Sequence, residues 1–179
     1  MKLAYRLTIA AALAAVGGTV AAHDPGTGLE NGFWSAILHP LTGLDHLVML
    51  CLLGLWLRFS RAGWTMALPL LASLAAGALI SFGLLPVAAT EGLVLASLAV
   101  ATAAVVARKS GWATVALLSA AMFFHGQAHL YDAGAVGLSV AMVAGLTTGS
   151  AIGLAIARLV SGMVIDRLAS RRKSHRALR

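Results

Sequence analysis

The chain has almost no cysteine, because Cys51 is the single one among 179 residues. A disulfide framework within the chain and a CxxC metal or redox motif are therefore excluded. Charge is also scarce: 11% of the residues are Asp, Glu, Lys or Arg, whereas a soluble domain carries about 25%. Together with 60% hydrophobic residues, these shortages predict a membrane protein without a soluble domain.

Long apolar runs make up most of the remaining sequence. Each is close to the roughly 20 residues that a bilayer-spanning helix requires. The runs lie at about 36–57, 64–82, 90–107, 111–130 and 133–157. The last run stays apolar to Ile165, as one long tilted helix or as a helix followed by a surface segment. We therefore predict an all-α membrane protein with a bundle of about five transmembrane helices, within a transmembrane domain over 23–166.

The first 22 residues have the pattern of a secretory signal. Lys2 and Arg6 precede an apolar core of small residues, and Val20 and Ala22 fit the small-residue rule for cleavage. We predict a cleavable signal peptide over 1–22, which makes His23 the mature N-terminus. An uncleaved first membrane helix is the alternative.

The basic residues indicate how the helices are oriented. If residues 23–35 are periplasmic and five helices alternate, every basic residue of the mature chain is cytoplasmic, as the positive-inside rule expects. These residues are Arg58, Arg61, Arg108, Lys109, Arg158, Arg167, Arg171, Arg172, Lys173, Arg176 and Arg179. The opposite side receives Asp24, Glu30, Asp45, Glu91 and Asp132.

The net charge of +7 is thus a topology signal, and no nucleic acid is expected as a partner. The expected partners are a lipid bilayer and, from the residues below, a divalent metal ion. The predicted location is a bacterial cytoplasmic (inner) membrane, with a periplasmic mature N-terminus. A basic cytoplasmic tail over 167–179 would face anionic lipid.

Ionisable residues open the first apolar run, in the motif HPLTGLDH at 39–46. Such groups at the edge of a membrane helix are costly and usually functional. The residue before a proline avoids the helical region, so His39 is predicted at the helix cap, with Pro40 in the first turn and Asp45 and His46 further inside. Capping of a helix end is the alternative role for these polar groups.

A second polar motif, HGQAHLYD at 125–132, closes the fourth run on the same predicted face. His125 and His129 are at i and i+4 on one helix face, where both rings can reach one ion. Asp132 extends the same stripe. The alternative is a structural pairing of polar groups.

Other candidates lie at the same predicted face. Glu91 opens the third run, where it could balance a cation or simply favour the helix dipole. His23 could chelate through its imidazole and the free amine, although a mobile terminus is the alternative. The imidazole and carboxylate set suits nickel, cobalt or zinc. The candidate metal ligands are His39, Asp45, His46, Glu91, His125, His129 and Asp132.

Sulfur atoms, small residues and tryptophans have ordinary structural roles in this reading. Met49, Cys51 and Met122 are expected to pack rather than to bind copper. Gly145, Gly149 and Gly153 recur every four residues, which favours close helix packing within the bundle or in a homo-oligomer, with backbone approach to an ion path as the alternative. The tryptophans are expected as interfacial anchors near segment ends: Trp34, Trp56, Trp64 and Trp112.

The order His-Pro-x-x-Gly-x-Asp-His, followed by an apolar run that ends Gly54-Leu55-Trp56, resembles the first membrane helix of the HupE/UreJ family of nickel and cobalt permeases. A glutamate that opens a later helix and the stretch FHGQAH at 124–129 add to the resemblance. It implies secondary transport of nickel(2+) or cobalt(2+) into the cytoplasm, supplying hydrogenase or urease, with no organic cofactor. The chain departs from the family at Asp132, where glutamate is usual, and around Leu154, where a histidine is common.

Three functions fit the residues. The first is a metal-ion permease with a periplasm-facing His/Asp/Glu site and no enzymatic activity. The second is an intramembrane hydrolase in which a histidine-bound metal activates water. The third is a metal sensor or scaffold that binds without translocation, against which stands the depth of His46 and His125 within their helices.

Overall fold

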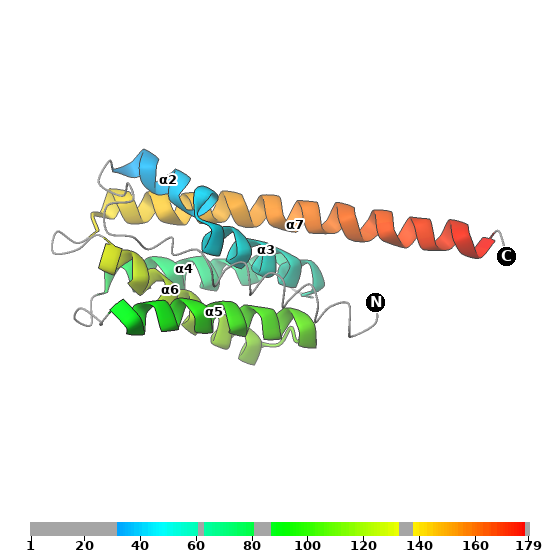
Figure 1. Ribbon diagram of the computed structural model, residues 1–179, viewed down its shortest axis with the longest axis horizontal. Coiled ribbons are helices and arrows are strands. Elements are labelled where there is room, and N and C mark those ends of the chain that lie inside the picture. Colours follow the sequence, from blue (N-terminus) through cyan, green and yellow to red (C-terminus); the bar gives the residue numbers. More distant parts are fainter. Residues whose placement is uncertain (1–31, 61–62, 81–86, 133–137, 178–179) are drawn as a thin grey trace.

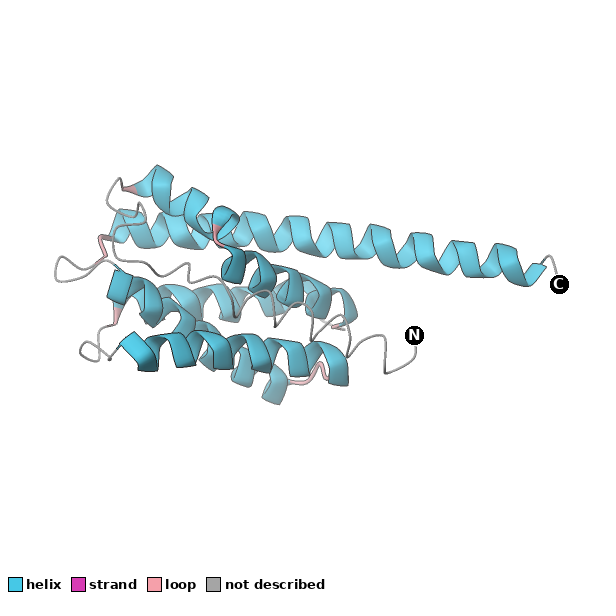
Figure 2. Ribbon diagram, in the orientation of Figure 1, coloured by secondary structure: helices cyan, strands magenta, loops and turns pink. Residues whose placement is uncertain are grey.

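The computed structural model describes residues 32–60, 63–80, 87–132 and 138–177. Within these ranges the regular elements are helices and there are no strands (Figure 2). This confirms the all-α class for the described part of the chain. The predicted signal peptide and His23 lie outside the described residues. The elements are α2 Phe33–Thr42, α3 Leu44–Phe59, the short 3-10 helix η2 Gly63–Met66, α4 Ala67–Leu79, α5 Val87–Ala107, α6 Trp112–Asp132 and α7 Val140–Ala177.

The helices differ in their fitness to cross a membrane. The stretch Val140–Arg171 of α7 has 32 residues, contains an 18-residue window with a mean hydropathy of 1.8, and has the length to cross by itself. The pair α2 and α3 meets the same criteria only when taken together, with a bend of 73° between them. Gly63–Leu79 and Glu91–Ala107 are apolar but shorter. At least one helix is therefore able to span a membrane, and the number five stays a prediction.

The prediction for the start of the first apolar run is wrong. Pro40 lies inside α2, and His39 lies in the last turn of that helix instead of at a helix cap. The chain breaks at Gly43, whose backbone is extended at φ −70° and ψ 129°. Packing explains the difference, because α2 rests on α7, where Gly149 leaves room for the Ile37 carbonyl and the Pro40 ring. Tertiary contact thereby offsets the poor helical preference of a residue before proline.

Glycines form two seams of close helix packing. In the first seam, a Cβ at Gly77 would collide with the Phe123 carbonyl, and a Cβ at Gly126 would collide with the Leu74 carbonyl, so α4 and α6 approach backbone to backbone. In the second, Gly145 faces the Phe33 carbonyl of α2. Small residues allow such an approach, which strengthens dispersion contacts where no hydrophobic effect drives helices together.

The face of α7 that carries Gly145, Gly149 and Gly153 is thus covered within the chain, by α2 and α3. The prediction of packing within the bundle is confirmed, and a homo-oligomer through this face is not shown. Figure 1 shows α2 and α3 along the first part of α7, with α5 and α6 on the other side of α3, whereas α4 also packs directly against α7. Helix α7 continues unbroken beyond the bundle to Ala177.

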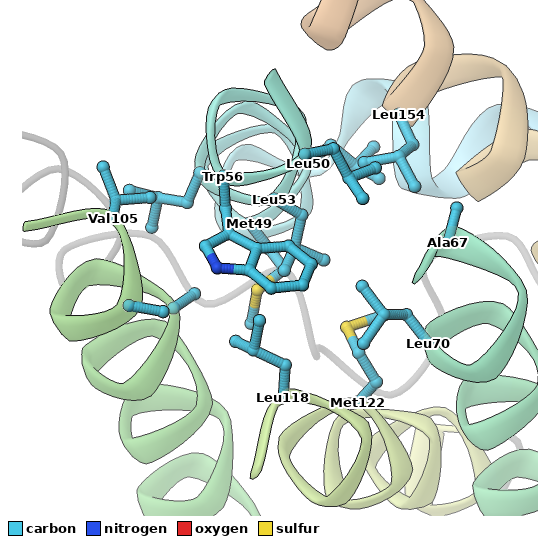
Figure 3. Packing of buried hydrophobic residues seen from close by; sticks show 14 of the residues in the cluster. Met49, Leu50, Leu53, Trp56, Ala67, Leu70, Val105, Leu118, Met122 and Leu154 are labelled. Atoms are coloured by element: carbon cyan, nitrogen blue, oxygen red, sulfur yellow. The ribbon is translucent and has the colours of Figure 1, made fainter. Parts of the chain in front are cut away.

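The apolar core lies between α3, α4, α5, α6 and α7 (Figure 3). Trp56 is at its centre, 1% exposed, and its indole Nε1 donates a hydrogen bond of 2.7 Å to the Lys109 carbonyl. The interfacial role expected for Trp56 is therefore wrong, because the ring fills the core. Leu154 is likewise part of this apolar cluster.

Candidate metal centre

The two polar motifs meet where α2 ends, α3 begins and α6 approaches its end. His39 comes from α2, Asp45 and His46 from α3, and His125 and His129 from α6. All five residues are buried, with relative exposures between 1% and 8%. The break at Gly43 matters here, because it turns the end of α2 toward the first turn of α3. Burial of so many ionisable groups is costly without a compensating task.

His46 is at the centre of the four imidazoles. Its ring centroid lies 4.9 Å from the rings of His39, His125 and His129 alike. His39 is 5.1 Å from His129, and His125 is 5.7 Å from His129. The four rings therefore form one compact imidazole cluster contributed by three helices.

Asp45 sets the tautomer and the orientation of the His46 ring. Its Oδ1 lies 2.7 Å from His46 Nδ1, so the ring donates its Nδ1–H to the carboxylate. This contact assigns the tautomer and leaves Nε2 with a lone pair directed into the cluster. A carboxylate behind a histidine is the arrangement that orients and strengthens metal-ligating imidazoles. Asp45 also lies in the first turn of α3, where the helix dipole favours negative charge.

The spacing between two ring nitrogens suits a shared ion. His46 Nε2 is 3.1 Å from His129 Nε2. Two nitrogens bound to one ion at about 2.0–2.1 Å, at bond angles of about 90–109°, are about 2.8–3.4 Å apart. A proton between the two rings holds the same spacing in the absence of an ion.

Two overlapping triads can each bring three ligand atoms together. They are His39, His46 and His129, and Asp45, His46 and His125, and within each triad the ligand atoms lie within 4.8 Å of one another. Because His46 belongs to both, an ion could pass from one triad to the other by exchanging the remaining two ligands. The donors are imidazole and carboxylate, the set that divalent nickel, cobalt and zinc accept.

Ser97 of α5 is a further member of the site that the sequence reasoning missed. Its hydroxyl donates to the Val94 carbonyl at 2.6 Å, and its oxygen lies 3.4 Å from His125 Nδ1. The oxygen can therefore accept the Nδ1–H of His125, which directs Nε2 of that ring inward. The one signal in the sequence is a serine within an apolar run, and it is too common to point to a site.

The residues between the histidines of the HGQAH motif explain how α6 is held. Gly126 lets α6 touch the backbone of α4. The Gln127 side-chain amide donates to the carbonyls of Gly77 and Ile80 at the end of α4. Both contacts fix α6 against α4, so His125 and His129 face α2 and α3 on the opposite side.

A small cavity continues the cluster into the core. It has a volume of about 10 Å³, close to the least space that holds a water molecule. Its lining combines three imidazoles, two thioethers and a hydroxyl with apolar groups: Pro40, His46, Met49, Leu50, Leu74, Met122, His125, His129 and Ser150.

One candidate ligand does not join the cluster, and the position of another relative to it lies outside the described residues. Glu91 lies in α5 with an exposed side chain and belongs to neither triad. Asp132 is the last residue of α6, one turn beyond His129, and its side chain lies outside the described part. Helix α5 contributes Ser97 to the site, two turns beyond Glu91.

The comparisons with known proteins agree with the geometry. The sequence model of the family described as HupE / UreJ protein matches residues 10–178. No curated protein and no solved structure matches the chain. The family consists of membrane proteins associated with nickel and cobalt transport for hydrogenase and urease, and it is not known as a family of enzymes. Because the match covers nearly the whole chain, the protein belongs to the HupE/UreJ family.

Proposed function

We propose that this protein is a nickel permease of the bacterial cytoplasmic membrane, with cobalt as a second substrate, and that its imidazole cluster binds the ion from the periplasm. One observation carries the proposal: four histidines and an aspartate from three helices converge, buried, in the described structure. The ion is the cargo, and no organic cofactor is required. The membership in a metal transport family supports the same function.

The chemistry of the cluster favours a divalent transition metal. Neutral imidazoles supply lone pairs without adding charge, and Asp45 supplies one negative charge to balance part of the ion's two. Hard ions such as magnesium and calcium prefer oxygen ligands and are disfavoured by an imidazole cluster. Asp132, one turn beyond His129, and Glu91 remain proposed ligands for an ion that approaches from outside.

The basic end of the bundle supports a proposed orientation of the chain in the membrane. Arg58, Arg108 and Arg158 lie near the end of α3 and the start of α4, far along the helices from the imidazole cluster. If the positive-inside rule holds, that end is cytoplasmic and the cluster faces the periplasm. An alkaline phosphatase fused after Arg179 is then expected to be inactive, whereas a green fluorescent protein fused there is expected to fluoresce. The reverse pattern would place the cluster on the cytoplasmic side.

Uptake of radiolabelled nickel, cobalt and zinc tests the function directly, in cells with and without the chain. We expect expression to raise intracellular nickel. Asp45→Asn retains shape but loses the charge, and we expect it to insert normally and to lose most of the uptake. Thr42→Ala is the matched control, because Thr42 is exposed and bonds only to its own helix through the Leu38 and His39 carbonyls.

The same measurement separates transport from sensing. A sensor or scaffold would bind nickel at the periplasmic face without raising the nickel content inside the cell. Normal uptake by Asp45→Asn at a normal protein level would remove the role proposed for the cluster.

A further inference from the structure

The cavity beside the imidazole cluster contains sulfur as well as nitrogen. Met49 and Met122 line it together with His46, His125 and His129. Both methionines are buried, at 2% and 3% exposure. Figure 3 shows both side chains in the apolar core, with Met49 on α3 next to Trp56 and Met122 on α6 next to Leu70.

The helix geometry puts the two methionines at the same depth. Met49 follows His46 by three residues in α3, and Met122 precedes His125 by three residues in α6. Residues three apart share a helix face and differ by about 4.5 Å along the axis. Because α3 and α6 run in opposite directions (Figure 1), both steps lead away from the cluster toward the basic end. The donor pairs therefore lie at successive depths along the two helices, with His46 and His125 at one level and Met49 and Met122 at the next.

We propose that Met49 and Met122 form an inner station, in which their thioether sulfurs receive the transported ion from His46 and His125. This inference rests on the proposed transport function. It names the next ligands on the path inward and the property that selects the ion. Ser150 of α7 offers a hydroxyl from the side of the same cavity.

Packing alone explains these methionines less completely. Met66 is also a buried core methionine, at 6% exposure, but it does not line the cavity. Leu53, Trp56 and Leu118 of the apolar core follow the two methionines toward the basic end, and the indole nitrogen of Trp56 is already bonded to the Lys109 carbonyl. The two sulfurs are the ligand atoms that the cavity lining adds to the imidazoles and the Ser150 hydroxyl.

Thioether chemistry predicts what the station accepts. Sulfur ligands favour the softer, later transition metals, whereas magnesium, calcium and manganese prefer oxygen. A neutral thioether also binds weakly enough to release the ion again. The station would therefore discriminate against manganese without trapping nickel.

The test replaces sulfur while keeping volume. Met49→Leu with Met122→Leu conserves side-chain volume, which cores tolerate well. Met66→Leu is the matched control. Purified proteins are reconstituted in liposomes for radiolabelled nickel uptake and are titrated with nickel in detergent. The single variants, Met49→Leu and Met122→Leu, serve if the double variant does not fold.

We expect the double variant to bind nickel within about twofold of the wild-type affinity and to take it up at least about tenfold more slowly. Met66→Leu is expected to match the wild type in both measurements. Wild-type uptake by the double variant, or by both single variants, would overturn the inner station. So would a loss of nickel binding equal to the loss of uptake, because the sulfurs would then belong to the outer site.

A failure of the proposed function gives a different result. In that case the wild type itself takes up no nickel, and the inner station falls with the transport function. If the wild type transports nickel and the double variant equals it, the permease stands and only the inner station is refuted.

Discussion

The imidazole cluster and the basic end of the bundle differ in how far their ionisable groups are buried. At the imidazole cluster, every described ionisable side chain is at least nine-tenths buried and lies within contact of another. At the basic end, Arg58 and Asp166 pair at 3.4 Å with side chains 40% and 70% exposed. There Arg108 lies over the Phe59 ring and Arg158 over the Trp64 ring, at 4.4 Å and 4.9 Å.

This difference in burial points to different roles for the cluster and the basic end. Exposed ion pairs contribute about 0–1 kcal/mol each, so the basic end adds little stability, and we propose that its charges orient the chain in the membrane. Buried imidazoles and a buried carboxylate are costly to desolvate; hydrogen bonds within the cluster offset part of that cost, and we propose that a bound ion offsets the rest. Substitutions at the cluster are therefore expected to reduce nickel binding and uptake, whereas substitutions at the basic end are expected to leave nickel uptake unchanged.

The largest effect is expected for His46→Gln, because His46 belongs to both triads. Glutamine retains an N–H that Asp45 can accept but lacks the imidazole lone pair. Loss of a residue that hydrogen-bonds to a metal ligand typically costs about 10–100-fold in metal affinity, and we expect loss of the ligand itself to cost more. Calorimetric titration of the purified protein with nickel measures the affinity. An affinity close to wild type would place the ion elsewhere.

A second substitution breaks the cluster without touching a ligand. A Cβ at Gly126 would collide with the Leu74 carbonyl and press α6 away from α4. We expect Gly126→Ala to destabilise the protein by about 1–3 kcal/mol, the usual cost of overpacking, and to weaken nickel binding by moving His125 and His129. Thermal unfolding in detergent measures this loss of stability.

The matched control for that substitution is Gly92→Ala, because a Cβ at Gly92 in α5 meets no atom within 4 Å. Alanine is the better helix former, so this variant should be neutral or more stable by up to about 1 kcal/mol. Equal destabilisation of both variants would show that the seam between α4 and α6 is not closely packed.

A smaller effect is expected at Ser97. Ser97→Ala removes the oxygen that lies 3.4 Å from His125 Nδ1, and the ring then loses its orientation. We expect about a tenfold loss in nickel affinity, the lower end for a partner behind a metal ligand. Ser97→Thr, which restores the hydroxyl, should recover most of it. The three proteins are titrated with nickel under one set of conditions. A nickel affinity of Ser97→Ala equal to that of the wild type would contradict this role.

The smallest effect is expected at the basic end. Arg58→Gln removes the exposed ion pair with Asp166, and we expect stability to change by about 0–1 kcal/mol with nickel uptake unchanged. Uptake and thermal unfolding are measured beside His46→Gln at matched expression. A loss of uptake as large as that of His46→Gln would show that the two ends do not differ in function.

Much of the organisation was open to prediction from the residues. Helices were expected at 64–82, 90–107 and 111–130, and they are present as η2 with α4, α5 and α6, because long apolar runs with polar breaks allow little else. The motifs that carry His46 and His125 were predicted on the same face of the membrane, and the structure brings their ring centroids to 4.9 Å. Asp166 was not placed by the charge argument, and it lies at the basic end beside Arg58.

The sequence by itself determined which chemistry the chain can perform, because imidazoles, a carboxylate and apolar runs are properties of residues and their spacing. Tertiary structure alone decided the break at Gly43, the burial of Trp56, the placing of Ser97 behind His125 and the exposure of Glu91. The physical reason is that helix contacts three or four residues apart are local, whereas backbone approach between α2 and α7 and between α4 and α6 depends on glycines far apart in the chain.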